Sequence, residues 1–154
     1  MRNIQRCIGF TVGCTLGFAV VGLLDVDGVT KRPSNKEIPI SFPVSGATLR
    51  AEIADTAHAR QKGLSGRKQL GRDRGILFVF KEEGYHQFWM KQMSFPIDII
   101  WLDKEKRIVD IAKQVEPDTF PHTFKPGSAA LYVLEVNAGF SEKHEVSIGD
   151  SMKW

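Results

Sequence analysis

The apolar runs of this chain are short, and prolines, glycines and polar turns separate them at close intervals. Such runs suit core strands and are too short for helices. Most connections between them are also too short for the helical crossovers that parallel strands need, so we expect a largely antiparallel sheet. The predicted fold class is α+β and mainly β, a compact curled sheet or barrel-like domain. The expected strands are Thr48–Ala54, Ile76–Phe80, Phe88–Met93, Ile97–Leu102, Arg107–Lys113, Ala129–Val136 and Ser151–Trp154.

Prolines mark an edge strand and a long open loop. Ile38–Val44 alternates like a strand, but Pro39 and Pro43 cannot donate backbone hydrogen bonds and confine it to the edge of a sheet. The segment Glu116–Ser128 carries three prolines, which predicts an open loop.

Two short helices are expected beside the strands. Thr56 has the side chain of a helix N-cap, and Gly63 suits the position after a helix end, so a helix is predicted over Ala57–Lys62. A second short helix is predicted over Ala138–His144.

The N-terminal residues have a pattern that is typical of an export signal or a membrane anchor. Arg2 and Arg6 precede an uncharged stretch, Cys7–Leu24, which is followed by acidic residues. Eighteen residues of helix span roughly 27 Å, close to the thickness of the hydrocarbon layer, so an uncleaved anchor fits as well as a cleaved signal. We expect the folded domain outside the cytoplasm, secreted or held at the cell membrane. The predicted organisation is 1–24 signal peptide or anchor, 25–37 linker and 38–154 globular domain.

The charge balance and the positions of the cysteines further limit the functions that the domain can have. The net charge is +3, from 21 basic and 18 acidic residues. Two of the basic residues, Arg2 and Arg6, lie before the hydrophobic stretch, so the rest of the chain is nearly neutral, and no nucleic-acid binding is expected. Both cysteines, Cys7 and Cys14, lie inside that stretch, so the domain needs no disulfide.

Three charged side chains fall on apolar strand faces. A hairpin centred on Phe95 would place Lys91 opposite Asp98, with Trp89 on the same face. Glu135 shares a face with other apolar residues of its strand. Charges in such places are paired or have shifted pKa values. Two interpretations stay open: a pocket for a small polar ligand, or a buried ion-pair network that fixes strand register.

A basic cluster lies between two of the expected strands. It is either a solvated face or a site for an anion such as phosphate, carboxylate or a lipid headgroup, because arginine forks suit such oxygens. The four histidines are far apart, and no zinc or nucleophile motif occurs, so neither a metal nor a cofactor is expected. The cluster consists of Arg60, Lys62, Arg67, Lys68, Arg72 and Arg74.

An ordered set of short motifs runs through the domain: Ala54-Asp55-Thr56 with Arg60, Gly63-Leu64, Gly75–Phe80, Phe88-Trp89-Met90-Lys91, Pro96–Ile100, Val133–Val136 with Ala138-Gly139, and Gly149-Asp150. At these residues the chain resembles the bacterial and archaeal family called domain of unknown function 192, over about Thr48–Lys153. The resemblance implies a compact β-rich fold, often behind a signal peptide or anchor, and no assigned activity. It marks as motif positions Arg60, Trp89, Lys91, Asp98 and Glu135.

This chain departs from the family pattern at two places. Gln92-Met93 stands where an asparagine-threonine pair is usual, and Lys106 replaces a common turn glycine. If the asparagine takes part in chemistry, that chemistry is altered in this member.

Three functions fit these observations. The first is a small-ligand-binding or accessory module of the cell envelope, with Arg60, Arg67, Trp89, Lys91, Asp98 and Glu135 as binding residues. The second is a small hydrolase-like enzyme in which Asp98 or Glu135 acts as the general base and Lys91 or Arg60 stabilises negative charge. Lys91, Asp98 and Glu135 are its candidate catalytic residues. The third is a structural subunit of an envelope complex that docks through the edge strand Ile38–Val44.

Overall fold

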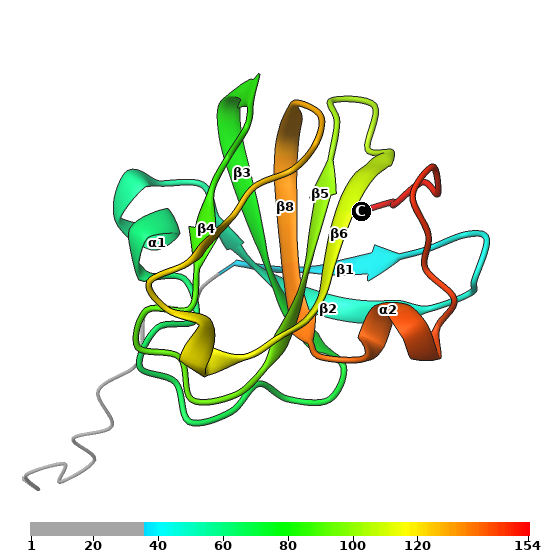
Figure 1. Ribbon diagram of the computed structural model, residues 1–154. Coiled ribbons are helices and arrows are strands. Elements are labelled where there is room, and N and C mark those ends of the chain that lie inside the picture. The colour runs from blue at the N-terminus through cyan, green and yellow to red at the C-terminus, as the bar shows by residue number, and fades with distance from the viewer. Residues whose placement is uncertain (1–35) are drawn as a thin grey trace, which may run out of the picture. The chain divides into compact units, whose positions relative to one another are not determined.

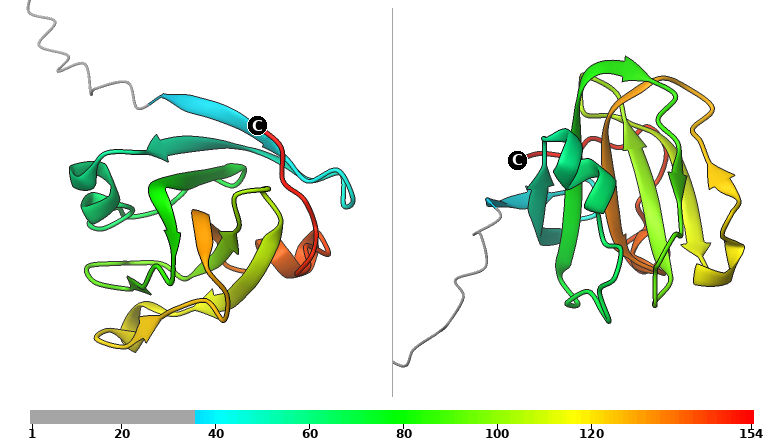
Figure 2. Two further views of the ribbon diagram at one scale, coloured as in Figure 1. Left: turned by 90° about the horizontal axis from the view of Figure 1, so that it is seen from above. Right: turned by 90° about the vertical axis from the view of Figure 1, so that its left-hand side faces the viewer.

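A computed structural model describes residues 36–154, and a curled six-stranded sheet organises this part of the chain (Figure 1). The strand order is β1-β2-β3-β8-β5-β6, and β4 and β7 form a separate two-stranded ribbon. The two views in Figure 2 show β1 and β2 turned away from the plane of β8, β5 and β6. The strands are β1 Glu37–Ser41, β2 Thr48–Ala54, β3 Arg74–Gly84, β4 Phe88–Trp89, β5 Ile97–Leu102, β6 Ile108–Val115, β7 Thr123–Phe124 and β8 Ala130–Asn137.

The predicted mainly β, largely antiparallel curled sheet is confirmed, with one exception. Strands β2 and β3 pair in parallel, while the other neighbours in the large sheet pair antiparallel. The connection between β2 and β3 is long enough for a crossover, and it contains the helix α1 (Ala57–Lys62). The expected signal or anchor at 1–24 and most of the expected linker lie outside the described residues. Within residues 36–154, no helix is long and apolar enough to cross a membrane.

The prediction of a hairpin centred on Phe95 is wrong. Strand β4 is only two residues long and pairs with β7, while β5 lies between β8 and β6. All six residues of β5 are buried, so this strand needs a long apolar neighbour on each side. The short segment Phe88–Trp89 offers no such neighbour, whereas β8 and β6 do.

The local predictions for α1 and β1 hold. The Oγ1 atom of Thr56 accepts a hydrogen bond from the backbone N–H of Ala59 at 3.1 Å, which is the expected N-cap contact. Gly63 follows the helix with a φ of 45°, a value that favours glycine. Strand β1 lies at the edge of the sheet as predicted, but it covers Glu37–Ser41, so it begins one residue before and ends three residues before the expected Ile38–Val44.

Three other segments differ from the prediction in extent. The second helix, α2, covers only Phe140–Lys143. The expected open loop contains a 3₁₀ turn, Pro117–Thr119, and strand β7. The expected last strand forms only isolated bridges, which pair Ser41 with Lys153 and Arg107 with Ser151.

Both faces of the sheet are covered, which produces two hydrophobic clusters. On one face Phe140 of α2, Phe42 and Met152 pack against the central strands. On the other face Leu64 and Met90, from the loops after α1 and β4, cover residues of β3, β5 and β8. Of the charged residues described next, Glu135 lies on this second face, whereas Asp98 lies on the first face, beside α2.

Candidate functional site

Asp98 is fully buried and acts as an acceptor for backbone amides. Its Oδ1 atom accepts hydrogen bonds from the N–H groups of Gln114 (2.8 Å) and Gly139 (3.1 Å). Its Oδ2 atom accepts one from the N–H of Ser141 (2.8 Å) in α2. Gln114 has a φ of 51°, and the pairing of β5 with β6 shifts register beside Asp98. The carboxylate therefore joins an irregular part of β6 to the start of α2.

Lys91 and Trp89 lie at the surface, away from Asp98. Trp89 is 53% exposed, and the Lys91 ammonium lies 5.7 Å from the centroid of the Trp89 ring. The ring of Phe120 packs edge-on against Trp89 at 6.2 Å between centroids. The expected meeting of Lys91 and Asp98 is wrong, because it depended on a pairing of β4 with β5 that does not form.

Arg60 connects α1 to strand β3 through hydrogen bonds. Its Nη1 atom donates hydrogen bonds to the carbonyl oxygens of Asp55 (2.6 Å) and Val79 (3.0 Å). Its guanidinium lies 5.3 Å from the centroid of the Phe80 ring. These contacts give Arg60 a structural role in this conformation.

Arg67 forms a two-pronged ion pair with Glu52. Its Nη1 and Nη2 atoms donate to the two carboxylate oxygens of Glu52 at 2.5 and 2.8 Å. The side chains are 30% and 21% exposed, so solvent still reaches the pair. The hydrogen bond to Glu52 raises the pKa of Arg67, with burial acting in the opposite direction. A planar bidentate pair of this kind fixes both the orientation of the guanidinium group and its distance from the carboxylate.

Glu135 is a buried acid near this ion pair. Only 5% of the residue is exposed. Burial, partly opposed by the positive charge of Arg67, raises the pKa of Glu135 to about 8. At neutral pH its carboxyl group is therefore mostly protonated and can donate a hydrogen bond.

Strand register places the two acids on one face of the sheet. Ile76 of β3 is the register partner of Glu52 on one side and of Glu135 on the other. Paired residues point to the same face, so the two acidic side chains flank Ile76. We call Glu52, Arg67 and Glu135 the acid–arginine cluster.

Two loops hold Arg67 over this face. The Ser65 hydroxyl donates to the carbonyl of Lys91 at 2.9 Å, and the Gly66 N–H donates to the carbonyl of Gln92 at 2.8 Å. Beside these bonds the side chains of Leu64 and Met90 are buried. The segment around Lys91 thus reaches the candidate site through its backbone.

The predicted binding residues therefore separate into two groups. Arg67 and Glu135 come together, whereas Asp98, Arg60 and the exposed Lys91 have partners elsewhere. Of the other residues of the basic cluster, Arg74 pairs with Glu37. Sequence reasoning missed Glu52 as a site residue, because its alternation in β2 is that of an ordinary solvent-facing side chain. Among residues 36–154, no group of three metal-binding side chains occurs.

The fold and this cluster define a mainly β domain that carries a half-buried ionic site. The family model for DUF192, described as an uncharacterised ACR, matches residues 40–154, and the chain belongs to this family. The chain is 30% identical over 112 residues to a UPF0127 protein of Thermococcus sibiricus, which covers 70% of this chain and 67% of the relative. A UPF0127 protein of Thermococcus kodakarensis is 31% identical over 112 residues, with 68% and 64% covered. The match thus spans about two thirds of the length of these relatives.

Two solved structures share the fold. A protein of unknown function from Novosphingobium aromaticivorans has a TM-score of 0.74 and 28% identity, with 80% of this chain and 90% of that chain covered. A protein from Sinorhizobium meliloti described as a putative transcription regulator has a TM-score of 0.69 and 30% identity, with 76% and 91% covered.

Proposed function

We propose that the domain is a small-ligand-binding module and that the acid–arginine cluster recognises its ligand. The observation that carries the proposal is the buried Glu135 carboxyl group, which lies close enough to the Arg67–Glu52 ion pair to interact electrostatically with Arg67. Desolvated polar groups with shifted pKa values occur often at binding sites. A purely structural role is the alternative, and the experiment below separates the two.

The charge of the cluster indicates an uncharged polar ligand. Near neutral pH the positive charge of Arg67 is balanced by Glu52, and Glu135 is mostly neutral. Because Arg67 and Glu52 are the more exposed members, a ligand meets them first and then the Glu135 hydroxyl group beneath. Hydroxyl and amide groups of a sugar or a small amide provide the donors and acceptors that such a surface needs.

Binding is testable on the full chain by NMR. Glucose, N-acetylglucosamine and acetamide are titrated while the side-chain N–H signals of the arginines are followed. We expect a saturable shift of the Arg67 signal with at least one probe. Arg67→Lys keeps the charge and removes the fork, so it should weaken binding at least about tenfold. Arg107→Lys, at an exposed arginine outside the cluster, is the matched control. Equal binding by both variants, or no shift with any probe, would contradict the proposal.

A hydrolase-like activity is the second candidate, and the raised pKa of Glu135 favours it. Two carboxyl groups with different protonation states can act as acid and base. Glu135 would give its proton to the leaving oxygen of an ester or glycoside as that bond breaks. The oxygen of water would bond to the other fragment, and Glu52 would take the water proton and pass it back to Glu135. Turnover of nitrophenyl esters or glycosides that Glu135→Gln abolishes would support this candidate. Turnover that survives this change would refute it.

We further propose that the domain acts in the cell envelope. The support is the uncharged stretch Cys7–Leu24 behind two arginines, which precedes the described part of the chain. Fractionation of cells that express the full chain, followed by protease treatment of intact cells, tests this location. Recovery in the cytoplasm, protected from the protease, would contradict it.

A further inference from the structure

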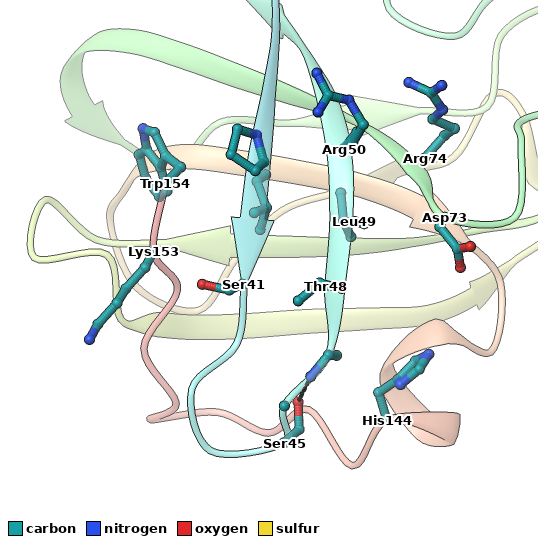
Figure 3. A pocket seen from close by; sticks show the side chains of 14 residues that line it. Ser41, Ser45, Thr48, Leu49, Arg50, Asp73, Arg74, His144, Lys153 and Trp154 are labelled. Atoms are coloured by element: carbon teal, nitrogen blue, oxygen red, sulfur yellow. Dashed lines mark hydrogen bonds between the residues drawn. The ribbon is translucent and has the colours of Figure 1, made fainter.

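A wide pocket lies on the surface formed by β1, β2 and the start of β3, and its lining is rich in cations. Its volume is about 950 Å³, within the range of small-molecule sites. Three basic side chains line it, Arg50, Arg74 and Lys153, with Asp73 as the acidic one (Figure 3). None of the acid–arginine cluster is among its lining residues.

Strand register places two arginines side by side at one end of the pocket. Arg50 of β2 and Arg74 of β3 are register partners in the parallel pair, and Figure 3 shows their side chains next to each other. A single carboxylate oxygen of Glu37 accepts a hydrogen bond from each. These two hydrogen bonds lower the pKa of Glu37. Glu37 therefore holds both guanidinium groups at this end of the pocket.

Most of the donors on these arginines remain available. A guanidinium has five N–H groups, and Glu37 takes one from each arginine. In the part of the chain that the structure describes, no other acceptor binds the guanidinium groups of Arg50 and Arg74. Two neighbouring guanidinium groups with free donors match the several oxygens of a phosphate.

Further donors continue along the pocket from the arginine pair. Ser41 and Thr48 are register partners, and neither hydroxyl group forms a hydrogen bond within residues 36–154. The Ser41 backbone exchanges two hydrogen bonds of 2.9 Å with that of Lys153, which fixes the position of Lys153 at this side. The ammonium group of Lys153 has no ion-pair partner in the described part of the chain. Figure 3 shows Thr48 and Ser41 between the arginines and Lys153.

We infer that this pocket binds a phosphate-bearing small molecule through Arg50 and Arg74, with the hydroxyl groups and Lys153 holding the rest of the ligand. The inference does not rest on the acid–arginine cluster. A free phosphate ester and the phosphate headgroup of a lipid share this chemistry. Because the pocket is open and Glu37 competes for the same guanidinium groups, binding is weak and salt-dependent.

The test is a titration of the full chain with sodium phosphate, with sodium chloride at equal ionic strength as the control titration. The NMR signals of the arginine side chains are the readout. We expect phosphate-specific shifts of Arg50 and Arg74. The double variant Arg50→Gln/Arg74→Gln should weaken phosphate binding at least about tenfold. Lys113→Gln/Lys125→Gln removes the same charge from two exposed lysines outside the pocket and should bind as the wild type does. Equal losses in both double variants would show mere charge attraction and overturn the inference.

A third variant keeps the test decisive if the arginine double variant does not fold. Glu37→Gln removes the competing charge and leaves both arginines, so it should bind phosphate more tightly than the wild type. Unchanged or weaker binding by this variant would contradict the inference.

A second arm separates the two sources of phosphate. The full chain is sedimented with vesicles of phosphatidylglycerol and phosphatidylcholine, or of phosphatidylcholine alone. The N-terminal stretch is present in every variant, so the comparison isolates the pocket. A preference for the anionic vesicles that the arginine variant loses assigns a lipid headgroup. Phosphate-specific shifts without this preference assign a free phosphate ester. The absence of both responses would refute phosphate recognition.

Discussion

The buried acid Glu135 should make the stability of the domain fall as the pH rises. Its pKa rises from an ordinary 4.5 to about 8 in the folded protein, so the folded state holds the proton more tightly than the unfolded state does. The stabilisation from this proton is complete below about pH 4.5 and is lost as the pH rises through about 8. Each pH unit between these values removes up to ~1.4 kcal/mol. Between about pH 5.5 and 8.5 the loss comes to about 3 kcal/mol.

The variant Glu135→Gln isolates this effect. Glutamine has nearly the shape of a protonated glutamate and does not titrate, so the two proteins should be most alike in acid. The free energy of unfolding is measured by urea denaturation of the full chain at several pH values. The wild type should lose about 3 kcal/mol relative to the variant over this range. Other titrating groups, such as His86, whose pKa is lowered by burial, occur in both proteins and cancel in the difference.

An exposed glutamate provides the matched control. The Glu116 side chain is exposed and makes no hydrogen bond or ion pair within residues 36–154. Glu116→Gln should therefore follow the wild type at every pH. If the stability difference between the wild type and Glu135→Gln were independent of pH, the carboxyl group would titrate normally, and the physical reasoning for the site would be wrong.

Two further predictions concern residues whose structural roles differ from those expected. Asp98→Ala should lower the free energy of unfolding by about 4 kcal/mol, because the buried N–H of Ser141 and the partly buried N–H groups of Gln114 and Gly139 lose a charged acceptor. A loss below about 1 kcal/mol on urea denaturation would show that these hydrogen bonds contribute little. Lys91→Ala should change the same free energy by less than about 1 kcal/mol, since Lys91 is exposed and, within residues 36–154, its ammonium contacts the exposed ring of Trp89. A larger loss would indicate a buried partner that this conformation lacks.

The acid–arginine cluster shows how far residue patterns lead toward a site. Glu135 is recognisable in the sequence because a charge stands in an apolar core strand, and such a charge needs an explanation. Glu52 gives no such signal, since it alternates with apolar residues as any half-exposed strand residue does. Only its register with Ile76 and the position of Arg67 make it part of the site.

The sequence by itself determined the elements whose signals are local. Strand β2 has the predicted bounds because its alternation is regular, and α1 does too because Thr56 and Gly63 mark its two ends. The burial of β5 also follows from its continuous apolar run.

Tertiary structure alone decided which strands pair and which charges meet. Strand β5 pairs with β8 and β6 because a strand buried on both faces needs a long partner at each edge. Strand β6 follows β5 directly in the chain, whereas β8 comes only after β6 and β7. Asp98 consequently lies beside the start of α2 and not beside Lys91. A one-residue change of register reverses the face of every side chain in a strand, so contacts across the sheet depend on long-range pairing that local patterns do not encode.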